Sequence, residues 1–387
     1  MARAAKIWPS NQTLKKMAKH KIGWMPGDGV GKEVMDATKT VLDAVGLDAE
    51  YTHLDIGWDF WCSDGDPLPP RTIEGLRACD AALFGAITSK PKAEAEAELA
   101  PEFQGKGMSY RSPIVRMRQE FDLYSNCRPC KAFDGNPLNF QDGIDLVVFR
   151  ENTEGMYTGV EWSPVDGPIR SALETHPSFE RFQSVPPEKM AFSSRIITWD
   201  GSERIVRAAF EYAKEHGYPT VTVVEKPNVL RETSGMFTDA AKAVAKDFPG
   251  IELWETNIDA MVMWLVKNPQ NYGVIATSNL FGDVVSDLCA QLVGGLGFAA
   301  AGNIGKDVAV FEPTHGSAPK YDGQDKVNPI ACILASKMML SFLGEGQKAD
   351  VVGKAIAKVI AEGKARTYDM GGSTKCSEMG AAIAAAL

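Results

Sequence analysis

The sequence predicts a mixed α/β fold with parallel or mixed strands. Short apolar runs of strand-like composition alternate with longer runs of helical periodicity, and no internal repeat or low-complexity stretch interrupts the alternation. With 387 residues, of which 44% are hydrophobic, the chain exceeds the length at which a single core normally stops growing. We therefore expect at least two α/β domains.

Four strand and helix pairs carry this prediction. The expected strands are 21–25, 81–87, 220–226 and 272–279, and the expected helices are 31–45, 72–78, 204–216 and 283–293. The stretch 158–198 breaks the alternation, because it is rich in proline, serine and charged residues. Such a stretch indicates an excursion from the core, for example a dimer arm.

Charge and composition exclude several classes of function. A net charge of −9 offers no general attraction for nucleic acid or an anionic membrane, so any basic site must be local and suited to a small anion. Seven scattered cysteines do not form the spacing of a disulfide framework or a zinc site. No apolar run reaches membrane-spanning length and no signal peptide is apparent. We expect a cytoplasmic protein.

The N-terminal segment is basic. Six lysine and arginine residues precede the first acidic residue, Asp28. The segment has only one arginine and few serines, so it is a poor match to a targeting peptide. We interpret it as a solvated extension.

Glycines 27, 29 and 31 in "PGDGVGKEV" lie between an expected strand and an expected helix. This is the place of a phosphate-cradling loop, although the spacing is not the G-x-G-x-x-G of a Rossmann domain. A tight strand-to-helix turn explains the glycines almost as well.

Basic and polar side chains follow or end several expected strands. Ser112 and Pro113 predict a helix start, which places Arg118 on that helix, and Arg128 comes ten residues later. Arg150 ends an apolar strand, where a buried guanidinium needs an anionic partner. Two or three arginines in a cleft would bind a polycarboxylate, whereas surface salt bridges are the alternative.

Other residues are candidates for catalysis or for metal binding. Tyr157 follows Arg150 by seven residues, and Lys226 and Asn228 come just past a strand, where α/β proteins keep their ligand sites. Asp283 and Asp287 are four residues apart and so share a helix face. They indicate either helix-start chemistry or a site for Mg²⁺ or Mn²⁺.

The segment "FEPTHGSAPKYDGQDKVNP" is dense in glycine, proline and polar residues, which predicts a loop over 311–329. Its His315, Lys320 and Tyr321 suit a clasp around a nucleotide. A mobile surface loop would have a similar composition.

These segments together resemble the β-decarboxylating dehydrogenases, the family of isocitrate, isopropylmalate and homoisocitrate dehydrogenases. The resemblance extends from "KIGWMPGDGVG" to "TKCSEMG" and includes "FRENTEGMY" and "HGSAPKYDGQDKVNP". It implies two α/β domains around a central cleft, not a Rossmann domain. The implied divisions are a large, nucleotide-binding domain (1–123 and 294–387), a small domain with the dimer interface, metal and substrate (124–154 and 199–293), and an arm (155–198).

The resemblance also implies roles for individual residues. The implied substrate-binding residues are Ser112, Ile114, Arg118, Arg128, Arg150 and Asn228. Tyr157 and Lys226 resemble the catalytic acid/base pair. The implied ligands of Mg²⁺ or Mn²⁺ are Asp259, Asp283 and Asp287. Asp259 and Lys226 would come from the other subunit of a homodimer.

The cofactor implied by the resemblance is NADP, with NAD as the alternative. The implied cofactor-binding residues are Thr88, His315, Gly316, Ser317, Ala318, Lys320, Tyr321, Val327, Asn328 and Tyr368. Lys320 favours NADP, because NAD enzymes of the family usually have an acidic residue there. However, the segment after "TYD" is short and lacks the arginine that completes the phosphate grip, and Asn268 replaces an arginine expected from the partner.

The substrate is expected to be a 2-(R)-hydroxy acid, with isocitrate first, then homoisocitrate, then isopropylmalate. Ile114 occupies a place where isocitrate enzymes have asparagine, and Ile114 and Val115 offer an apolar face. Arg111, "RQEFDLY" and "KCSE" resemble isocitrate dehydrogenase. A non-catalytic regulatory subunit is an alternative of a different class.

Overall fold

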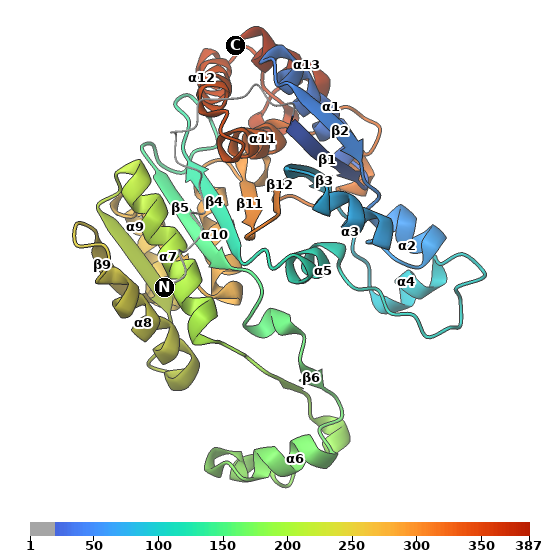
Figure 1. Cartoon of the computed structure of the whole chain (residues 1–387), viewed down its shortest axis with the longest axis vertical. Coiled ribbons are helices and arrows are strands. Elements are labelled where there is room, and N and C mark those ends of the chain that lie inside the picture. The colour runs from blue at the N-terminus through green and yellow to red at the C-terminus, as the bar shows by residue number, and fades with distance from the viewer. Residues whose placement is uncertain (1–19) are drawn as a thin grey trace.

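A ten-stranded mixed sheet forms the centre of the molecule, with helices on both faces (Figure 1). The computed structural model describes residues 20–387. The strand order is β2-β1-β3-β12-β11-β4-β5-β10-β8-β9. The predicted α/β class is confirmed. The strands are β1 (His20–Gly27), β2 (Ala49–His53), β3 (Ala81–Ala86), β4 (Ser125–Lys131), β5 (Asp145–Glu151), β8 (Thr220–Glu225), β9 (Glu252–Asn257), β10 (Val274–Thr277), β11 (Ala300–Ile304) and β12 (Ala309–Pro313).

Strand direction changes only near the middle of this sheet. β11 is antiparallel to both β12 and β4, and β4 is antiparallel to β5, whereas the remaining paired neighbours are parallel. The β11–β4 pair therefore joins two largely parallel halves. One half consists of β2, β1, β3, β12 and β11, and the other of β4, β5, β10, β8 and β9.

Alternate residues of the strands face different helix layers, as expected for a sheet covered on both sides. The largest core cluster lies on one face and includes Val147 and Phe149 of β5. On the other face, α9 and α10 pack over Leu146 and Val148, and α3 and α5 pack over Ala82 and Phe84. The helices α5 and α10 thus flank the central strands on the same face of the sheet.

The helix positions agree with the expected periodicity. The described α-helices are α1 (Gly31–Ala44), α2 (Trp58–Asp64), α3 (Pro70–Arg77), α4 (Lys92–Ala97), α5 (Pro113–Glu120), α6 (Gly167–Glu174), α7 (Trp199–His216), α8 (Arg231–Ala245), α9 (Ile258–Lys267), α10 (Asn279–Leu292), α11 (Ile330–Phe342), α12 (Gly346–Glu362) and α13 (Cys376–Ala385). Each expected strand and helix is present. The loop expected over 311–329 is wrong at its start, because Phe311–Pro313 end β12, where Phe311 is buried and paired.

The β1–α1 glycines are required by the backbone. Gly27 and Gly29 have φ values of +68° and +52°. A Cβ at Gly27 would lie 2.0 Å from the carbonyl oxygen of Ala86, and one at Gly29 would lie 2.4 Å from that of Ser317. Only glycine accepts both this conformation and this close approach. The turn therefore packs directly against the segment that follows β12.

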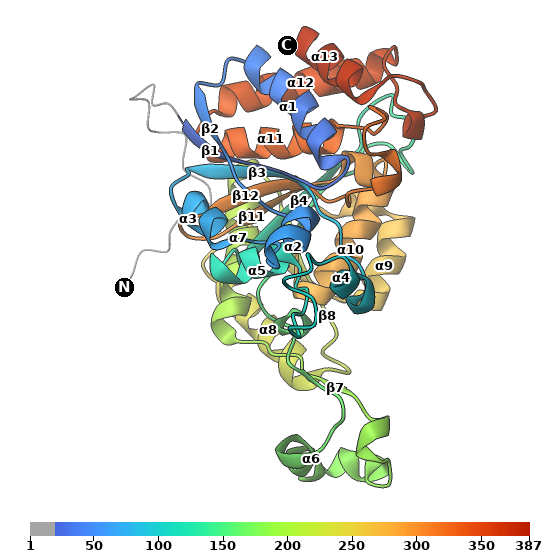
Figure 2. The ribbon, with the colours of Figure 1, turned by 90° about the vertical axis from the view of Figure 1, so that its right-hand side faces the viewer.

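An arm over residues 155–198 extends away from the body of the molecule, as Figures 1 and 2 show. It consists of a two-stranded antiparallel ribbon, β6 (Glu161–Trp162) and β7 (Phe192–Ser193), together with α6 and short 3-10 turns. Val165 is buried, whereas Met156, Trp162 and Phe182 are exposed. The predicted excursion from the core is confirmed.

Two further expectations concern the chain as a whole. Within the described residues, no helix is both long enough and sufficiently apolar to cross a membrane. All seven cysteines, which lie in this part of the chain, are free thiols. The expected solvated extension before His20 lies outside the described residues.

Candidate active site

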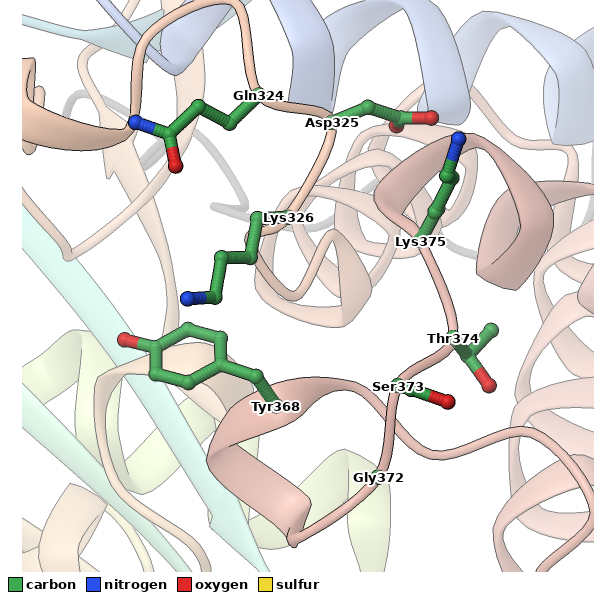
Figure 3. A pocket seen from close by; sticks show the side chains of 8 residues that line it. All are labelled: Gln324, Asp325, Lys326, Tyr368, Gly372, Ser373, Thr374 and Lys375. Carbon is green, nitrogen blue, oxygen red and sulfur yellow. The ribbon is translucent and has the colours of Figure 1, made fainter.

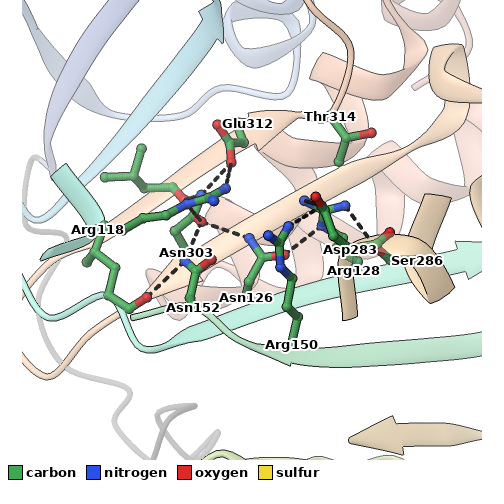
Figure 4. Close-up of polar contacts among 12 residues, drawn as sticks. Arg118, Asn126, Arg128, Arg150, Asn152, Asp283, Ser286, Asn303, Glu312 and Thr314 are labelled. Carbon is green, nitrogen blue, oxygen red and sulfur yellow. Dashed lines mark hydrogen bonds and ion pairs between the residues drawn. The ribbon is translucent and has the colours of Figure 1, made fainter. Parts of the chain in front are cut away.

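Three arginines from three elements converge on the face of the sheet covered by α10 (Figure 4). Arg118 comes from α5, Arg128 from β4 and Arg150 from β5, with exposed fractions of 7%, 8% and 1%. We call these three residues the arginine cluster. A buried guanidinium without a partner destabilises a protein by about 3–5 kcal/mol, so each must be paired.

Arg118 is held by neutral and acidic groups on the neighbouring strands. Its Nε donates to Asn303 Oδ1 at 3.0 Å, and its Nη2 donates to Glu312 Oε1 at 3.1 Å. Burial and the nearby Arg128 lower the pKa of Arg118, whereas Glu312 opposes this effect. Arg118 therefore connects α5 to β11 and β12.

Arg128 and Arg150 are both paired with α10. Arg128 Nη1 donates to Ser286 Oγ at 2.8 Å and to Asp287 Oδ1 at 3.2 Å. Arg150 Nε and Nη2 donate to Asn279 Oδ1 at 3.1 and 2.8 Å, and its Nη1 donates to Asp283. Burial and the other two arginines lower the pKa of Arg150 to about 10.

The two aspartates face this cluster from α10. Asp283 is one-third exposed and Asp287 is more open, with side-chain exposures of 33% and 61%. Burial alone would raise the pKa of Asp283, but Arg150, Tyr157 and Arg128 outweigh it, and the pKa is lowered. The helix-start interpretation is wrong, because α10 begins at Asn279 and Asp283 lies in its second turn.

Tyr157 lies in a 3-10 turn that follows β5 and the "FRENTEG" segment. Its hydroxyl donates to Asp283 Oδ2 at 2.6 Å, and the Arg150 guanidinium lies 5.0 Å from the ring centroid. Burial and the hydrogen bond to Asp283 raise the pKa of Tyr157. The phenol is therefore protonated at neutral pH, with its proton directed at the carboxylate.

Lys226 and Asp259 form a second, separate pair. Lys226 Nζ donates to Asp259 Oδ1, and this hydrogen bond lowers the pKa of Asp259. The Asp259 side chain is 69% exposed, and Asn228 beside the pair is exposed. Within residues 20–387, no hydrogen bond or ion pair joins this pair to the arginine cluster.

No set of three or more metal-binding side chains assembles within the part of one chain that the structure describes. Asp283 and Asp287 supply two carboxylates on one helix face, with oxygen atoms of the kind that Mg²⁺ and Mn²⁺ prefer. The pair fits a divalent cation that takes its remaining ligands from elsewhere.

The expected substrate residues at the start of α5 differ in their surroundings. Ser112 occupies the N-cap position, as predicted, but its hydroxyl makes no capping hydrogen bond. Ile114 is only 8% exposed and packs in a core cluster with Met117 and Leu123, whereas Val115 is partly exposed. Of the predicted apolar face, Val115 is therefore the more accessible part.

Thr88 and Ser317 meet beside the β1–α1 turn. Their hydroxyls are 2.6 Å apart, and the Ser317 carbonyl oxygen accepts a hydrogen bond from the backbone N–H of Val30. The Asp28 carboxylate connects this turn to the neighbouring segments, because it accepts hydrogen bonds from the backbone N–H groups of Thr88 and Trp58, both at 2.7 Å. Burial raises the pKa of Asp28 despite these bonds. Sequence reasoning missed this role of Asp28.

The next expected cofactor residues belong to the segment that follows β12. His315 has a buried Nε2 without a hydrogen-bond partner among the described residues, and burial lowers its pKa. Gly316 is exposed, and Ala318 adopts a φ of +39°. Val327 packs against the core, and Asn328 donates to Asp369 Oδ2 at 3.1 Å.

A cavity of about 370 Å³ lies where this segment meets the loop before α13 (Figure 3). Its lining includes Lys326, Tyr368, Ser373, Thr374 and Lys375. Lys320 and Tyr321 lie beside it, with Lys320 Nζ 4.6 Å from the Tyr321 ring centroid and the Tyr321 and Tyr368 rings 5.4 Å apart. The structure thus places Lys320, Tyr321 and Tyr368 together, as the sequence predicts.

Several polar residues of the site were not predicted. They are Asn126, Asn279, Ser286, Asn303 and Glu312, which hold the arginine cluster. Asn126 and Asn279 lie in the same segments as the predicted Arg128 and Asp283. Each is an amide side chain inside or just after a strand. A buried amide needs hydrogen-bond partners, so this position indicates a polar site.

Comparison with known proteins shows the family of this chain. Residues 21–383 match the family model described as isocitrate/isopropylmalate dehydrogenase. The chain belongs to the isocitrate/isopropylmalate dehydrogenase family. Members of this family are β-decarboxylating dehydrogenases that act on hydroxy acids with NAD(P) and a divalent metal. The suspected family is confirmed.

Individual members of the family carry different names. The chain is 39% identical to a 3-isopropylmalate dehydrogenase from Methanothermobacter thermautotrophicus and 39% identical to an isocitrate/homoisocitrate dehydrogenase from Thermus thermophilus, covering 95% of this chain and 98% of each relative. An isocitrate dehydrogenase structure from Methylococcus capsulatus superposes with a TM-score of 0.81 at 37% identity, covering 95% of this chain and 99% of that one. The chain spans only 58% of Protein DlpA from Legionella pneumophila, which is 37% identical over 94% of this chain.

Proposed function

We propose that this protein catalyses the metal-dependent oxidative decarboxylation of a 2-(R)-hydroxy acid, with isocitrate as the first candidate and NADP as the cofactor. The observation that carries the proposal is the convergence of the arginine cluster, Tyr157 and two aspartates on one face of the sheet. Three guanidinium groups beside two carboxylates suit a polyanionic substrate held next to a cation.

The arginine cluster would bind the carboxylates of the substrate. Arg118, Arg128 and Arg150 come from three different elements and lie near one another (Figure 4). Guanidinium groups grip carboxylates bidentately, and burial excludes the water that would compete. These contacts orient the substrate and hold its carboxylates in place.

The cation would be held by Asp283 and Asp287 of one subunit and Asp259 of the partner subunit. When bound, it would act as a Lewis acid toward the substrate oxygens, while the nicotinamide accepts hydride. The fit rests on the donor set, because Asp283 and Asp287 are accessible carboxylates one helical turn apart.

Tyr157 would act as the proton donor to the carbon from which CO₂ departs. Its hydroxyl proton is poised at Asp283 and its pKa is raised, so it is available as an acid at neutral pH. A phenol of high pKa transfers its proton slowly unless a positive charge stabilises the phenolate. Lys226 of the partner subunit would supply that charge and complete the acid/base pair.

Formation of a homodimer would bring Lys226 and Asp259 into the site of the other subunit. Helices α9 and α10 share a core cluster, and both present exposed apolar side chains to the outside. These side chains are Met263, Trp264, Val266, Leu280 and Val284. Exposed apolar side chains on two packed helices are typical of a protein interface. They lie beside both Asp259 and Asp283, on the same two helices.

Isocitrate ranks first among the substrates because the cluster offers three arginines, and Arg118 has an Nη1 without a partner in the described chain. Homoisocitrate is the second candidate and isopropylmalate the third. Isopropylmalate would need an apolar wall at α5, and Ile114 is buried in the core while Val115 is partly exposed.

NADP is favoured over NAD by the cavity beside Tyr368. Lys320, Lys326 and Lys375 make no ion pair within the described residues, and the last two line the cavity together with Ser373 and Thr374. Ammonium and hydroxyl groups are the donors that a ribose 2′-phosphate requires. They would replace the arginine that the short segment after Tyr368 lacks.

The alternative class is a non-catalytic regulatory subunit of such an enzyme. A single assay separates the two. The purified chain is mixed with isocitrate, homoisocitrate, isopropylmalate, malate or tartrate, each with NAD or NADP and Mn²⁺, and reduced nucleotide is followed at 340 nm. We expect the highest kcat/KM with isocitrate and NADP. Absence of turnover with every pair would favour the regulatory subunit.

A further inference from the structure

Two buried asparagines lie side by side behind the arginine cluster. Asn303 of β11 pairs in register with Asn126 of β4, and Asn126 pairs with Arg150 of β5. Both amide side chains are fully buried. Opposed residues of antiparallel strands project from the same face of a sheet, so both amides lie on the face of the arginines (Figure 4).

Asn303 is the centre of a hydrogen-bond network. Its Oδ1 accepts from Arg118 Nε at 3.0 Å, Asn126 Nδ2 at 2.7 Å and Asn152 Nδ2 at 3.0 Å. Its Nδ2 donates to Glu312 Oε1 at 2.7 Å, the same oxygen that accepts from Arg118 Nη2. The guanidinium of Arg118 is thus held at two nitrogens by groups that are themselves bonded to each other.

Asn126 extends the network to the next arginine. Its Oδ1 accepts from Arg128 Nε at 2.6 Å, while its Nδ2 donates to Asn303. A continuous series of hydrogen bonds therefore runs from Arg118 through Asn303 and Asn126 to Arg128. We call Asn303 and Asn126 the amide relay. It crosses the β11–β4 pair, where the two halves of the sheet join.

The chemistry of the amide suits this place better than a carboxylate. The guanidinium is planar, so a hydrogen bond at Nε together with a second contact sets the direction of its plane. A neutral acceptor at Nε leaves the positive charge available to an anion. A carboxylate in either position would add negative charge to a site that already contains Glu312, Asp283 and Asp287.

We propose that Asn303 and Asn126 are positioning residues that set the separation and tilt of the Arg118 and Arg128 guanidinium groups. The amide relay thereby determines which spacing of carboxylates the site binds. This inference rests on the proposed function, because it assigns the two arginines to substrate. The asparagines themselves act only through the arginines.

The test compares Asn303→Ala and Asn126→Ala with a matched control, Asn136→Ala. Asn136 is also buried and donates to the carbonyl oxygen of Val293 at 3.2 Å, outside the network of the arginines. We expect either relay variant to raise KM for the hydroxy acid about 10- to 100-fold, since small misplacements of binding groups have effects of this size. The change in kcat is expected to be smaller, and KM for the nucleotide should not change.

The control variant is expected to lower the melting temperature without raising KM for the hydroxy acid. The double variant should raise KM by less than the product of the two single effects, because both residues act in one network. An unchanged KM in both relay variants, or an equal rise in the control, would overturn the inference. Asn126→Ala removes only two hydrogen bonds and decides the matter if Asn303→Ala does not fold.

A structural readout separates this inference from the proposed function. Crystal structures of the wild type and Asn126→Ala should show the Arg128 guanidinium rotated in the variant, with Arg150 unmoved. If Arg128 keeps its orientation, the amide relay is not a positioning device. If it rotates but the wild type converts none of the tested acids, the proposed function fails while the positioning role stands.

Discussion

The arginine cluster and the Lys226–Asp259 pair differ in how completely one chain builds them. The arginines are buried, and each of them has hydrogen-bond partners on at least one other element of the same chain. Lys226 and Asp259 contact each other, and the Asp259 side chain is largely exposed. Buried charges require complete pairing, whereas exposed ones do not. The Asp259 carboxylate therefore remains accessible to another molecule, as the proposed homodimer requires.

Replacement of the shared carboxylate should have the largest effect. Asp283 pairs with Arg150 and Tyr157 and is a proposed metal ligand. We expect Asp283→Asn to lower kcat/KM by about 10²- to 10³-fold and to raise the Mn²⁺ concentration needed for half-maximal activity, because it removes charge where charge stabilisation is required. Circular dichroism should show little change in folding.

The matched control for this variant is Asp239→Asn, on the exposed surface of α8. It should leave the Mn²⁺ dependence of the rate unchanged. If Asp283→Asn and the wild type have equal kcat/KM and equal Mn²⁺ dependence, Asp283 has only a structural role.

Mixed dimers test the division of the site between chains. We expect Tyr157→Phe and Lys226→Met each to lower kcat about 10²-fold on its own. When the two variants are unfolded and refolded together, half of the dimers should be mixed and one of their two sites intact, so activity should recover to about a quarter of the wild-type value. Specific activity after refolding is the measurement.

Recovery would occur only if Tyr157 and Lys226 act from different subunits. Failure to recover, with dimers of normal size by light scattering, would mean that both residues act within one chain. Refolding each variant by itself provides the baseline.

Removal of lysines from the cavity beside Tyr368 should have a smaller effect. We expect Lys326→Ala and Lys375→Ala each to raise KM for NADP about 10-fold, as for loss of one charge-assisted contact, and to leave KM for NAD unchanged. Lys354→Ala, at an exposed position of α12, is the control. A similar rise in KM for both nucleotides would show that the cavity does not receive the 2′-phosphate.

The smallest expected effect is on stability at low pH. The pKa of Asp283 is lowered in the folded chain relative to its ordinary value of 3.8, so its charged form stabilises the fold above that pH, and this contribution is lost as the pH falls through the lower folded value. In the presence of a chelator, the wild type should be more stable than Asp283→Asn at pH 6. The difference should narrow as the pH falls below 3.8.

Urea unfolding at several pH values measures this difference directly. A difference that stays constant from pH 6 to pH 3 would mean that the charge of Asp283 does not contribute to folding stability.

Local patterns were sufficient for most of the fold. The Ser112–Pro113 start of α5, the strand-to-helix turn at Gly27 and Gly29, and the α10 periodicity all agree with the structure. Each depends on a few neighbouring residues, which propensity and periodicity capture. The prediction of a loop is wrong at the end of β12. Proline and polar residues follow Phe311 and are typical of a loop, but the strand there lies between two others in the sheet.

The sequence also determined the family and the residue types of the site. Arginine, tyrosine, lysine and aspartate occur in long motifs that are characteristic of the family. The roles of these residues stay predictions.

Only the tertiary structure decided which side chains meet. Asn303 lies 177 positions from Asn126 and 185 from Arg118, yet its amide contacts both. Such contacts follow from strand order and register, which bring distant segments together across the β11–β4 pair, and no local pattern encodes them. For the same reason, the separation of Lys226 and Asp259 from the arginine cluster became apparent only once the chain was folded.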